Sequence, residues 1–210
     1  MKNSPLLLGV VSGLFALGMS AEAVAFTVTI NPGTRAVYLR VGNGVFSTAN
    51  YSAGGTPGTG GAINTVSVTV PAASLGNGTN LAMTTNATTG VSNYDSYEFC
   101  NVPAQLYIGG FYRLPGLTGT ATLTVTAPTN LTNGAGDTIP FSQISWTSSG
   151  NGDTGAQPIL AGTFSGGTQT LASFPVNSWR ESCHSFVYGN DNVVAAGTFS
   201  GRVTYTLSAP

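Results

Sequence analysis

The cysteines, the histidine and the acidic residues are the side chains of this sequence that could carry out chemistry. There are two cysteines, one histidine and seven acidic residues among 210. Cys100 and Cys183 are expected to form a disulfide if the chain is exported, because oxidising compartments favour pairing. A zinc site is the alternative, but two cysteines and His184 without close spacing fall short of a zinc ligand set. These residue types therefore predict one disulfide, no metal and no other cofactor.

A catalytic role would have to fall on His184 or on a pair of acidic residues. His184 adjoins Cys183 in ESCHSFVYG, at the expected entrance to a strand, where an ordinary hydrogen-bonding role is expected. A Ser-His-Asp triad can draw its members from distant positions, but the chain has no G-x-S-x-G elbow. Asp95 and Glu98 could form a carboxylate pair for glycoside hydrolysis, and they fit equally well in a polar turn. The prediction is a protein that is not an enzyme, with a secreted hydrolase as the third-ranked alternative.

Aromatic side chains gather around both cysteines in the sequence. The cluster consists of Tyr94, Tyr97, Phe99, Tyr107, Phe111, Tyr112 and Trp179. A disulfide would bring the two segments together, so these rings either fill the core and cover the disulfide or form a platform on which sugars stack. The core role is the first expectation for the cluster. Tyr97 and Trp179 are the contacts to test if the chain is a self-contained adhesin or carbohydrate-binding module.

The N-terminal segment has the layout of a secretory signal peptide. Lys2 precedes an apolar run over residues 6–19, and Ala23-Val24-Ala25 is a small-x-small cleavage site. Cleavage would leave residues 26–210 as the mature, soluble chain. We expect that chain to be secreted and to lie outside the cell or on the cell surface, after crossing the periplasm if the host is a Gram-negative bacterium.

The expected mature part carries little charge. Residues 26–210 contain five arginines, no lysine and six acidic residues. The chain therefore has no basic patch for nucleic acid or for an anionic membrane surface, and neither is expected as a partner. Little charge also means little repulsion between copies, which favours self-association.

Alternation of apolar and polar residues with a period of two, typical of β-strands, recurs throughout residues 26–210. It is clearest in FTVTI (26–30), NTVSVTV (64–70), TATLTVTA (120–127) and GRVTYTLSAP (201–210). Further strands are expected at Ala36–Val41, Gln105–Leu114, Ile139–Thr147, Ile159–Phe164, Gln169–Phe174, Ser185–Tyr188 and Thr198–Phe199. Gly/Asn/Pro-rich turns separate them without helical crossovers. The pattern predicts one all-β domain over residues 26–210, an antiparallel immunoglobulin-like β-sandwich with Greek-key connections, and a closed barrel is the alternative.

The expected first strand of the mature chain is followed by Asn31-Pro32-Gly33, a sequence that suits a tight hairpin turn poorly. Pro-Gly favours a type II turn, and that turn splays the two strands that flank it. Phe26–Ile30 should therefore cross to the opposite sheet or leave its own subunit. Its apolar side chains, Phe26, Val28 and Ile30, could fill alternate pockets along the open edge of a neighbouring copy. Head-to-tail repetition of such a contact gives a filament unless the chain of contacts closes.

The signal peptide, the Thr/Val-rich mature start, the single disulfide and the terminal GRVTYTLSAP together resemble secreted bacterial pilin subunits. The most similar types are chaperone–usher fimbrial subunits and the spore-coat-U-like proteins of archaic pili. The resemblance implies an incomplete immunoglobulin-like sandwich that the N-terminal strand of the next subunit completes. It assigns Phe26, Val28 and Ile30 to the donated strand, and Val203, Tyr205 and Leu207 to the closing strand. Implied partners are other copies of the chain, an export or assembly chaperone, and host or matrix glycans.

Overall fold

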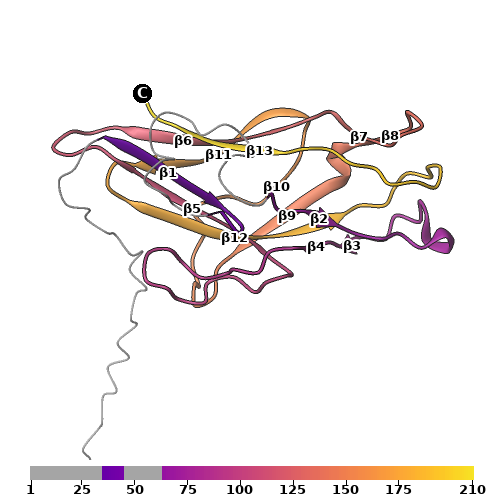
Figure 1. Ribbon diagram of the computed structural model, residues 1–210, viewed down its shortest axis with the longest axis horizontal. Coiled ribbons are helices and arrows are strands. Elements are labelled where there is room, and N and C mark those ends of the chain that lie inside the picture. Colours follow the sequence, from indigo (N-terminus) through magenta and orange to yellow (C-terminus); the bar gives the residue numbers. More distant parts are fainter. Residues whose placement is uncertain (1–34, 45–62) are drawn as a thin grey trace, which may run out of the picture.

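The computed structural model describes residues 35–44 and 63–210. Within these ranges the chain is almost entirely β-strand and turn, with two single-turn 3₁₀ helices (Figure 1). The strands are β1 (Ala36–Val41), β2 (Val66–Ser67), β3 (Leu81–Ala82), β4 (Thr84–Thr85), β5 (Leu106–Arg113), β6 (Thr120–Ala127), β7 (Asn130–Thr132), β8 (Thr138–Pro140), β9 (Ile144–Ser149), β10 (Gly162–Thr163), β11 (Gly167–Pro175), β12 (Trp179–Tyr188) and β13 (Thr204–Ser208). The 3₁₀ helices are η2 (Ala72–Ser74) and η3 (Phe141–Gln143). No helix in the described ranges is long and apolar enough to cross a membrane.

The larger sheet has the strand order β1-β5-β12-β9-β10, and β3 also pairs with β12. Every pairing in it is antiparallel. Its central strand, β12, is hydrogen-bonded to β5 on one side and to β9 on the other. Both faces of β12 are buried near its middle, because Ser182 and His184 face the core while Cys183 lies under a covering loop. This strand therefore contributes buried side chains both to the main core and to the outer face of the sheet.

The smaller sheet has the order β11-β6-β13 and is also antiparallel. The alternation predicted for TATLTVTA is confirmed, because Leu123 and Val125 are fully buried while Thr122, Thr124 and Thr126 are more exposed. In β11 the pairing register shifts between Thr170 and Ala172. Such a bulge lets two consecutive residues, Leu171 and Ala172, both enter the core. Two short pairs, β2 with β4 and β7 with β8, complete the structure.

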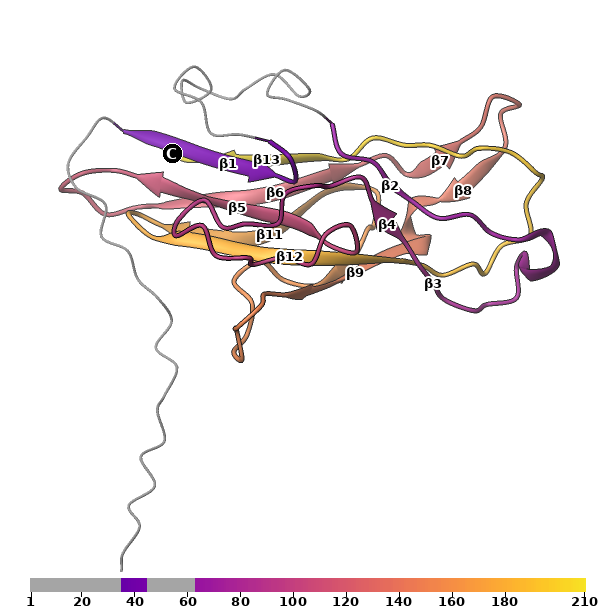
Figure 2. The ribbon, with the colours of Figure 1, turned by 60° about the horizontal axis from the view of Figure 1, so that its bottom comes forward.

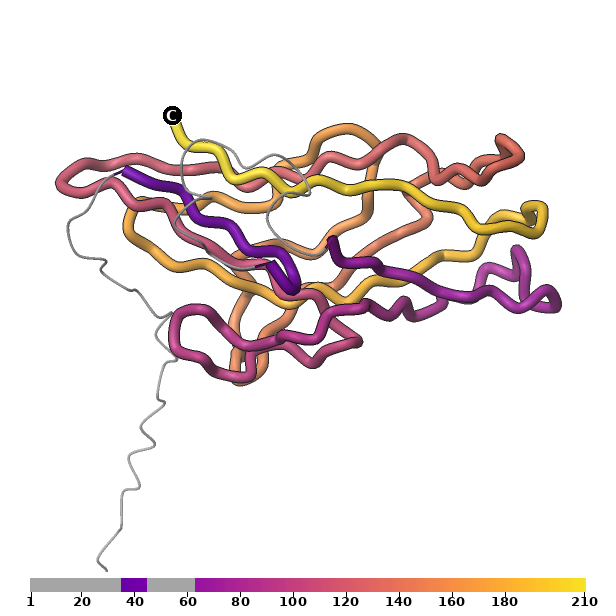
Figure 3. Tube along the Cα trace, in the orientation of Figure 1, coloured from indigo at the N-terminus to yellow at the C-terminus, as the bar shows by residue number. Residues whose placement is uncertain are grey.

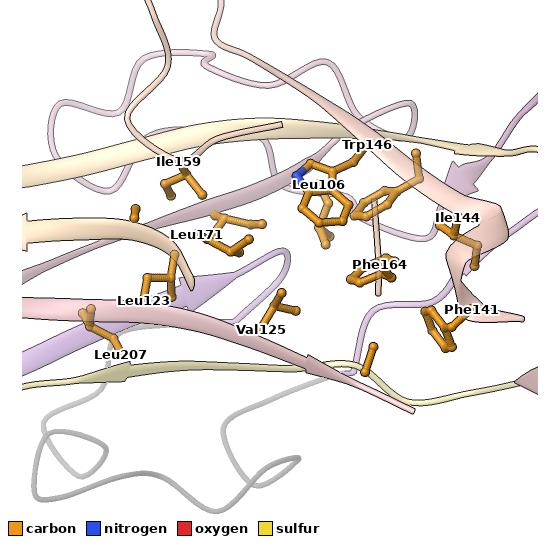
Figure 4. Close-up of a cluster of buried hydrophobic side chains, with 14 of the residues drawn as sticks. Leu106, Leu123, Val125, Phe141, Ile144, Trp146, Ile159, Phe164, Leu171 and Leu207 are labelled. Atoms are coloured by element: carbon orange, nitrogen blue, oxygen red, sulfur yellow. The ribbon is translucent and has the colours of Figure 1, made fainter. Parts of the chain in front are cut away.

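The main core lies between the two sheets, which form two layers in the turned view (Figure 2). Figure 4 shows Leu123, Val125 and Leu207 from the smaller sheet facing Leu106 and Trp146 from the larger one. Phe164 contacts Trp146, with ring centroids 4.6 Å apart. The antiparallel all-β fold class and the disulfide of the prediction are confirmed.

Several strand predictions were wrong in extent. The run 139–147 is interrupted by η3, which follows Pro140, a residue that cannot donate a ladder hydrogen bond. Of 64–70, β2 keeps only Val66–Ser67, and of 159–164, β10 keeps only Gly162–Thr163. Residues 198–199 form no strand, although Ser200 bridges to Thr132. Alternation alone does not create a strand where no neighbouring strand is in reach.

The segment from residue 63 to 105 runs along the larger sheet as a mostly irregular chain, purple to magenta in Figure 3. Its last part, residues 87–105, covers the outer face of the larger sheet, the face turned away from β6, β11 and β13 (Figures 1 and 2). A second small core of Phe99, Cys100, Tyr107 and Cys183 lies there. The cysteines are therefore part of this outer cover and not of the main core.

Candidate functional site

The disulfide fixes the outer cover to the centre of the larger sheet. Cys100 and Cys183 are bonded, with Cα atoms 5.5 Å apart and a sequence separation of 83 positions. Phe99 packs edge-on against Tyr107, with ring centroids 6.4 Å apart. The predicted pairing is confirmed, and it brings the segment around residues 94–100 next to the start of β12.

Cross-strand rows on the outer face position the side chains next to the disulfide. Register places Tyr38, Phe111 and Trp179 opposite one another on β1, β5 and β12. Each ring contacts the next in this row. The ring centroids are 4.1 Å apart for Tyr38 and Phe111 and 5.4 Å apart for Phe111 and Trp179. Tyr94 from the covering loop extends this row, 6.2 Å from Trp179. Trp179 is thus held between two aromatic neighbours, which favours one fixed orientation of the indole.

A buried arginine holds the covering loop from below. Arg40 is only 3% exposed, and its guanidinium donates hydrogen bonds to the backbone oxygens of Gly42, Thr89 and Val91 and to the side chain of Asn93. It also lies over the Tyr107 ring, 4.4 Å from the centroid. Burial lowers the pKa of Arg40, and the nearby Tyr107 and Glu181 partly oppose this effect. Arg40 therefore ties β1 to the segment that leads into Tyr94.

The Tyr107 hydroxyl donates a 2.6 Å hydrogen bond to Glu181 Oε2. Burial, followed by the negative charge of Glu181, raises the pKa of Tyr107 above its usual range, so the phenol remains a donor. The ring can lie in this position because Gly109, between the two residues on the sheet, has no side chain. A Cβ at Gly109 would be 2.3 Å from the Tyr107 hydroxyl oxygen and 2.9 Å from Glu181 Cβ. Gly109 therefore leaves the space in which the Tyr107 hydroxyl reaches Glu181.

A cleft of about 600 Å³ opens on this outer face. Three segments line it: the loop 94–99, the loop 151–158 between β9 and β10, and the first residues of β12. Tyr97 is 51% exposed and Tyr94 is 39% exposed. Trp179 also lines the cleft, so Tyr97 and Trp179, the two predicted platform residues, are brought together. We call this space the aromatic–acid cleft.

Backbone contacts hold the two loops of the aromatic–acid cleft against each other. Asn151 donates its backbone N–H to Phe99 O at 2.9 Å and its side-chain amide to Glu98 O at 3.0 Å. Its side chain also exchanges hydrogen bonds with Asn101. Gly150 is required next to it, because a Cβ there would be 2.3 Å from the Phe99 ring. The cleft is therefore a built feature of the fold and not a chance gap between loops.

Three carboxylates and one guanidinium line the aromatic–acid cleft: Asp95, Asp153, Glu181 and Arg180. The carboxylates accept hydrogen bonds from uncharged groups, namely the Tyr97 backbone N–H, the Gln157 amide and the Tyr107 hydroxyl. Arg180 Nε is buried and has no hydrogen-bond partner among the described residues. Within the described residues no group of three or more His, Cys, Asp or Glu side chains is placed to hold a metal ion. The cleft combines exposed aromatic rings with an excess of negative charge.

Within the segment predicted to be the closing strand, Thr204–Ser208 forms β13 at the edge of the smaller sheet. It lies next to β1, the edge strand of the larger sheet (Figures 1 and 2). In the described part of the chain, neither β1 nor β13 has a second strand on its outer side. Val203 lies just before β13, and Tyr205 and Leu207 pack against the main core. The residues predicted to be donated, Phe26, Val28 and Ile30, lie outside the described residues, as does the predicted signal peptide.

His184 is placed differently from its prediction. It lies in the middle of β12 and is fully buried, stacked on the Trp146 ring with centroids 5.8 Å apart and edge-on to the Phe186 ring at 6.2 Å. Neither ring nitrogen makes a well-formed hydrogen bond with a described residue, although the Ile159 backbone interacts weakly with the ring. The predicted position at the entrance to a strand was wrong, because His184 lies within β12. Burial lowers the pKa of His184 to about 4, with a smaller opposing effect from the backbone of Ile159. The imidazole is therefore neutral at neutral pH.

Comparison with known proteins gives no match, whether to a family model, to a curated protein sequence or to a solved structure. The function therefore has to be inferred from the residues of the chain. The sequence predicted Tyr97 and Trp179 as platform residues, but it did not predict that Asp153, Arg180 and Glu181 lie beside them. The loop that carries Asp153 is linked to the others only by the fold, and no spacing in the sequence indicates it.

Proposed function

We propose that this chain is a non-enzymatic structural subunit of an extracellular filament, and that subunits join by donating Phe26–Ile30 to a neighbouring copy. In this proposal residues 1–25 direct export, and the two sheets form an incomplete immunoglobulin-like sandwich with Greek-key connections. The disulfide, typical of oxidising compartments, stabilises each subunit.

The observation that carries the proposal is the incompletely covered side of the core between β1 and β13. Val37, Leu39 and Val41 of β1 pack against the core but remain partly exposed, as do Val203 and Tyr205 beside and within β13. In contrast, Leu123 and Val125 on the neighbouring β6 are fully buried. An additional strand at this edge would cover those side chains and satisfy the outer main-chain groups of β13.

The segment Phe26–Ile30 has the properties that such a strand needs. Its three apolar residues alternate with two threonines, and it carries no charge. Only five residues separate it from β1, and they include the Asn-Pro-Gly sequence that disfavours a tight hairpin back onto that strand. Donation to a second copy would therefore repeat from subunit to subunit and produce a linear assembly.

The test is electron microscopy and size-exclusion chromatography of three forms of the exported chain. One lacks residues 26–30, one carries Phe26→Ser, Val28→Ser and Ile30→Ser, and the matched control carries Thr27→Ser and Thr29→Ser. The deletion and the apolar-face variant should yield no filaments, whereas the control should polymerise like the unaltered chain. Filaments of unchanged length from the deletion would overturn strand donation.

A further inference from the structure

We propose that the aromatic–acid cleft binds a glycan whose sugars are neutral or carry a free amine, and that it rejects sugars with carboxylates. The cleft lies on the outer face of the larger sheet, whereas the proposed strand donation involves the edge formed by β1 and β13. This inference therefore does not depend on assembly and holds equally for a monomeric subunit.

The aromatic part of the cleft is the first reason. Tyr94 and Tyr97 are exposed residues, whereas Phe99 and Tyr107, which pack beside the disulfide, are buried. Trp179 is fixed beside them by its contacts with Phe111 and Tyr94. Exposed aromatic rings in a concave site give apolar area for the C–H faces of sugars, and their rigidity keeps the entropic cost of binding low.

The polar groups are the second reason. Sugar hydroxyls are donors, and the cleft offers acceptors, because each carboxylate has a second oxygen besides the one engaged with Tyr97 N, Gln157 or Tyr107. Arg180 also lines the cleft, and its guanidinium group is a donor that can complement these acceptors. Hydrogen bonds to charged groups are the stronger kind, so a few of them can fix the orientation of a sugar.

The charge of the cleft decides the class of sugar. Three of the seven acidic residues of the chain line it against one arginine, which leaves a formal charge of −2 from three negative groups and one positive group. A uronate or a sialic acid would bring a further negative charge into this space and be repelled. A neutral sugar avoids the repulsion, and a protonated amino sugar gains attraction that weakens as salt is added.

The cleft is also preorganised. The disulfide, the Arg40 contacts and the Asn151 hydrogen bonds hold its walls from three directions. A site that is ordered before it meets its ligand loses less entropy on binding. Val193 and Leu117 are also exposed apolar residues, but neither lines this cleft.

The experiment measures binding of the whole exported chain to an array of neutral, amino-bearing and anionic oligosaccharides at low and physiological salt. Hits are then titrated by calorimetry against Tyr97→Ala and Asp153→Asn, with Leu117→Ala and Asp137→Asn as matched controls outside the cleft. Circular dichroism and thermal melting establish that each variant is folded.

The expected result is binding of neutral or amino glycans only, with a Kd about tenfold weaker for Tyr97→Ala and unchanged for both controls. If Tyr97→Ala and Asp153→Asn bind glycans as tightly as the unaltered chain, the binding site lies elsewhere and the proposal is wrong. Binding restricted to anionic glycans, binding of a lysine-rich peptide in place of sugars, or no binding to any glycan on the array would also overturn it. Filament formation has no part in these measurements, so their failure is distinct from failure of strand donation.

Discussion

Acidification should destabilise this protein through His184, and replacement of this residue should remove that effect. The imidazole is fully buried between Trp146 and Phe186 without a well-formed hydrogen bond to a described residue, and its pKa is lowered to about 4. In the unfolded chain it has the ordinary value near 6.5. The unfolded state therefore takes up a proton at a pH at which the folded state does not.

The sign and size follow from these two pKa values. Above pH 6.5 the residue is neutral in both states, and its full contribution to stability is present. As the pH falls from 6.5 to 4, protonation favours the unfolded state, and the contribution is lost. A difference of about 2.5 pKa units at about 1.4 kcal/mol each makes the total loss roughly 3.5 kcal/mol, of which about 3 kcal/mol is lost by pH 4.

The assay is urea unfolding at pH 7.5, 6.5, 5.5, 4.5 and 4.0 with the disulfide intact, on the unaltered chain and on His184→Leu. Carboxylates also titrate in the lower part of this range, so the informative quantity is the difference between the two proteins. We expect His184→Leu to lose less stability on acidification, by roughly 3 kcal/mol at pH 4. Phe174→Leu, which alters packing at a fully buried core residue of β11 without adding or removing a titrating group, should lose stability in parallel with the unaltered chain. Parallel curves for His184→Leu would refute the reasoning.

Three further predictions concern the outer cover. Reduction of the disulfide, which spans 83 residues, should lower the free energy of unfolding by about 4.5 kcal/mol, measured by urea unfolding with and without reductant; a loss below about 1 kcal/mol would contradict the role given to it. Gly109→Ala should cost about 1–3 kcal/mol because its Cβ would displace Tyr107, whereas Gly134→Ala, with nothing within 4 Å, should be close to neutral in the same assay. Arg40→Met should raise amide exchange in residues 89–93 and leave exchange in β6 unchanged, and equal protection in both proteins would show that the guanidinium does not hold the loop.

The long strands with clear alternation were predictable from the sequence. Strands β5, β6 and β11 fall within about two residues of their predicted limits, because residues of the apolar faces, such as Ile108 and Leu123, have to meet across one core. The N-terminal half of β12 was missed, since its residues are buried on both faces near Cys183 and the alternation is lost. Short strands failed for the opposite reason, because alternation was present without a partner strand.

The candidate site was predictable only where a covalent link joins its parts. The disulfide allowed Tyr97 and Trp179 to be placed near each other from their positions beside Cys100 and Cys183. Asp153 reaches the same cleft through hydrogen bonds made by Asn151, and such tertiary contacts leave no pattern in the sequence. The burial of His184 could not be predicted from the sequence either, because it depends on tertiary contacts with residues of other strands.

The most direct test of strand donation is cross-linking between two differently labelled copies. Both native cysteines are in the disulfide, so thiols added by Thr29→Cys in one copy and by Thr206→Cys in the other are the reactive ones. The two variants are exported separately, mixed during assembly and treated with a short thiol-reactive cross-linker. The proposal predicts a cross-linked species that contains one chain of each kind. If a chain that carries both substitutions instead cross-links only within itself, at every concentration, the strand stays with its own subunit and the proposed function is wrong.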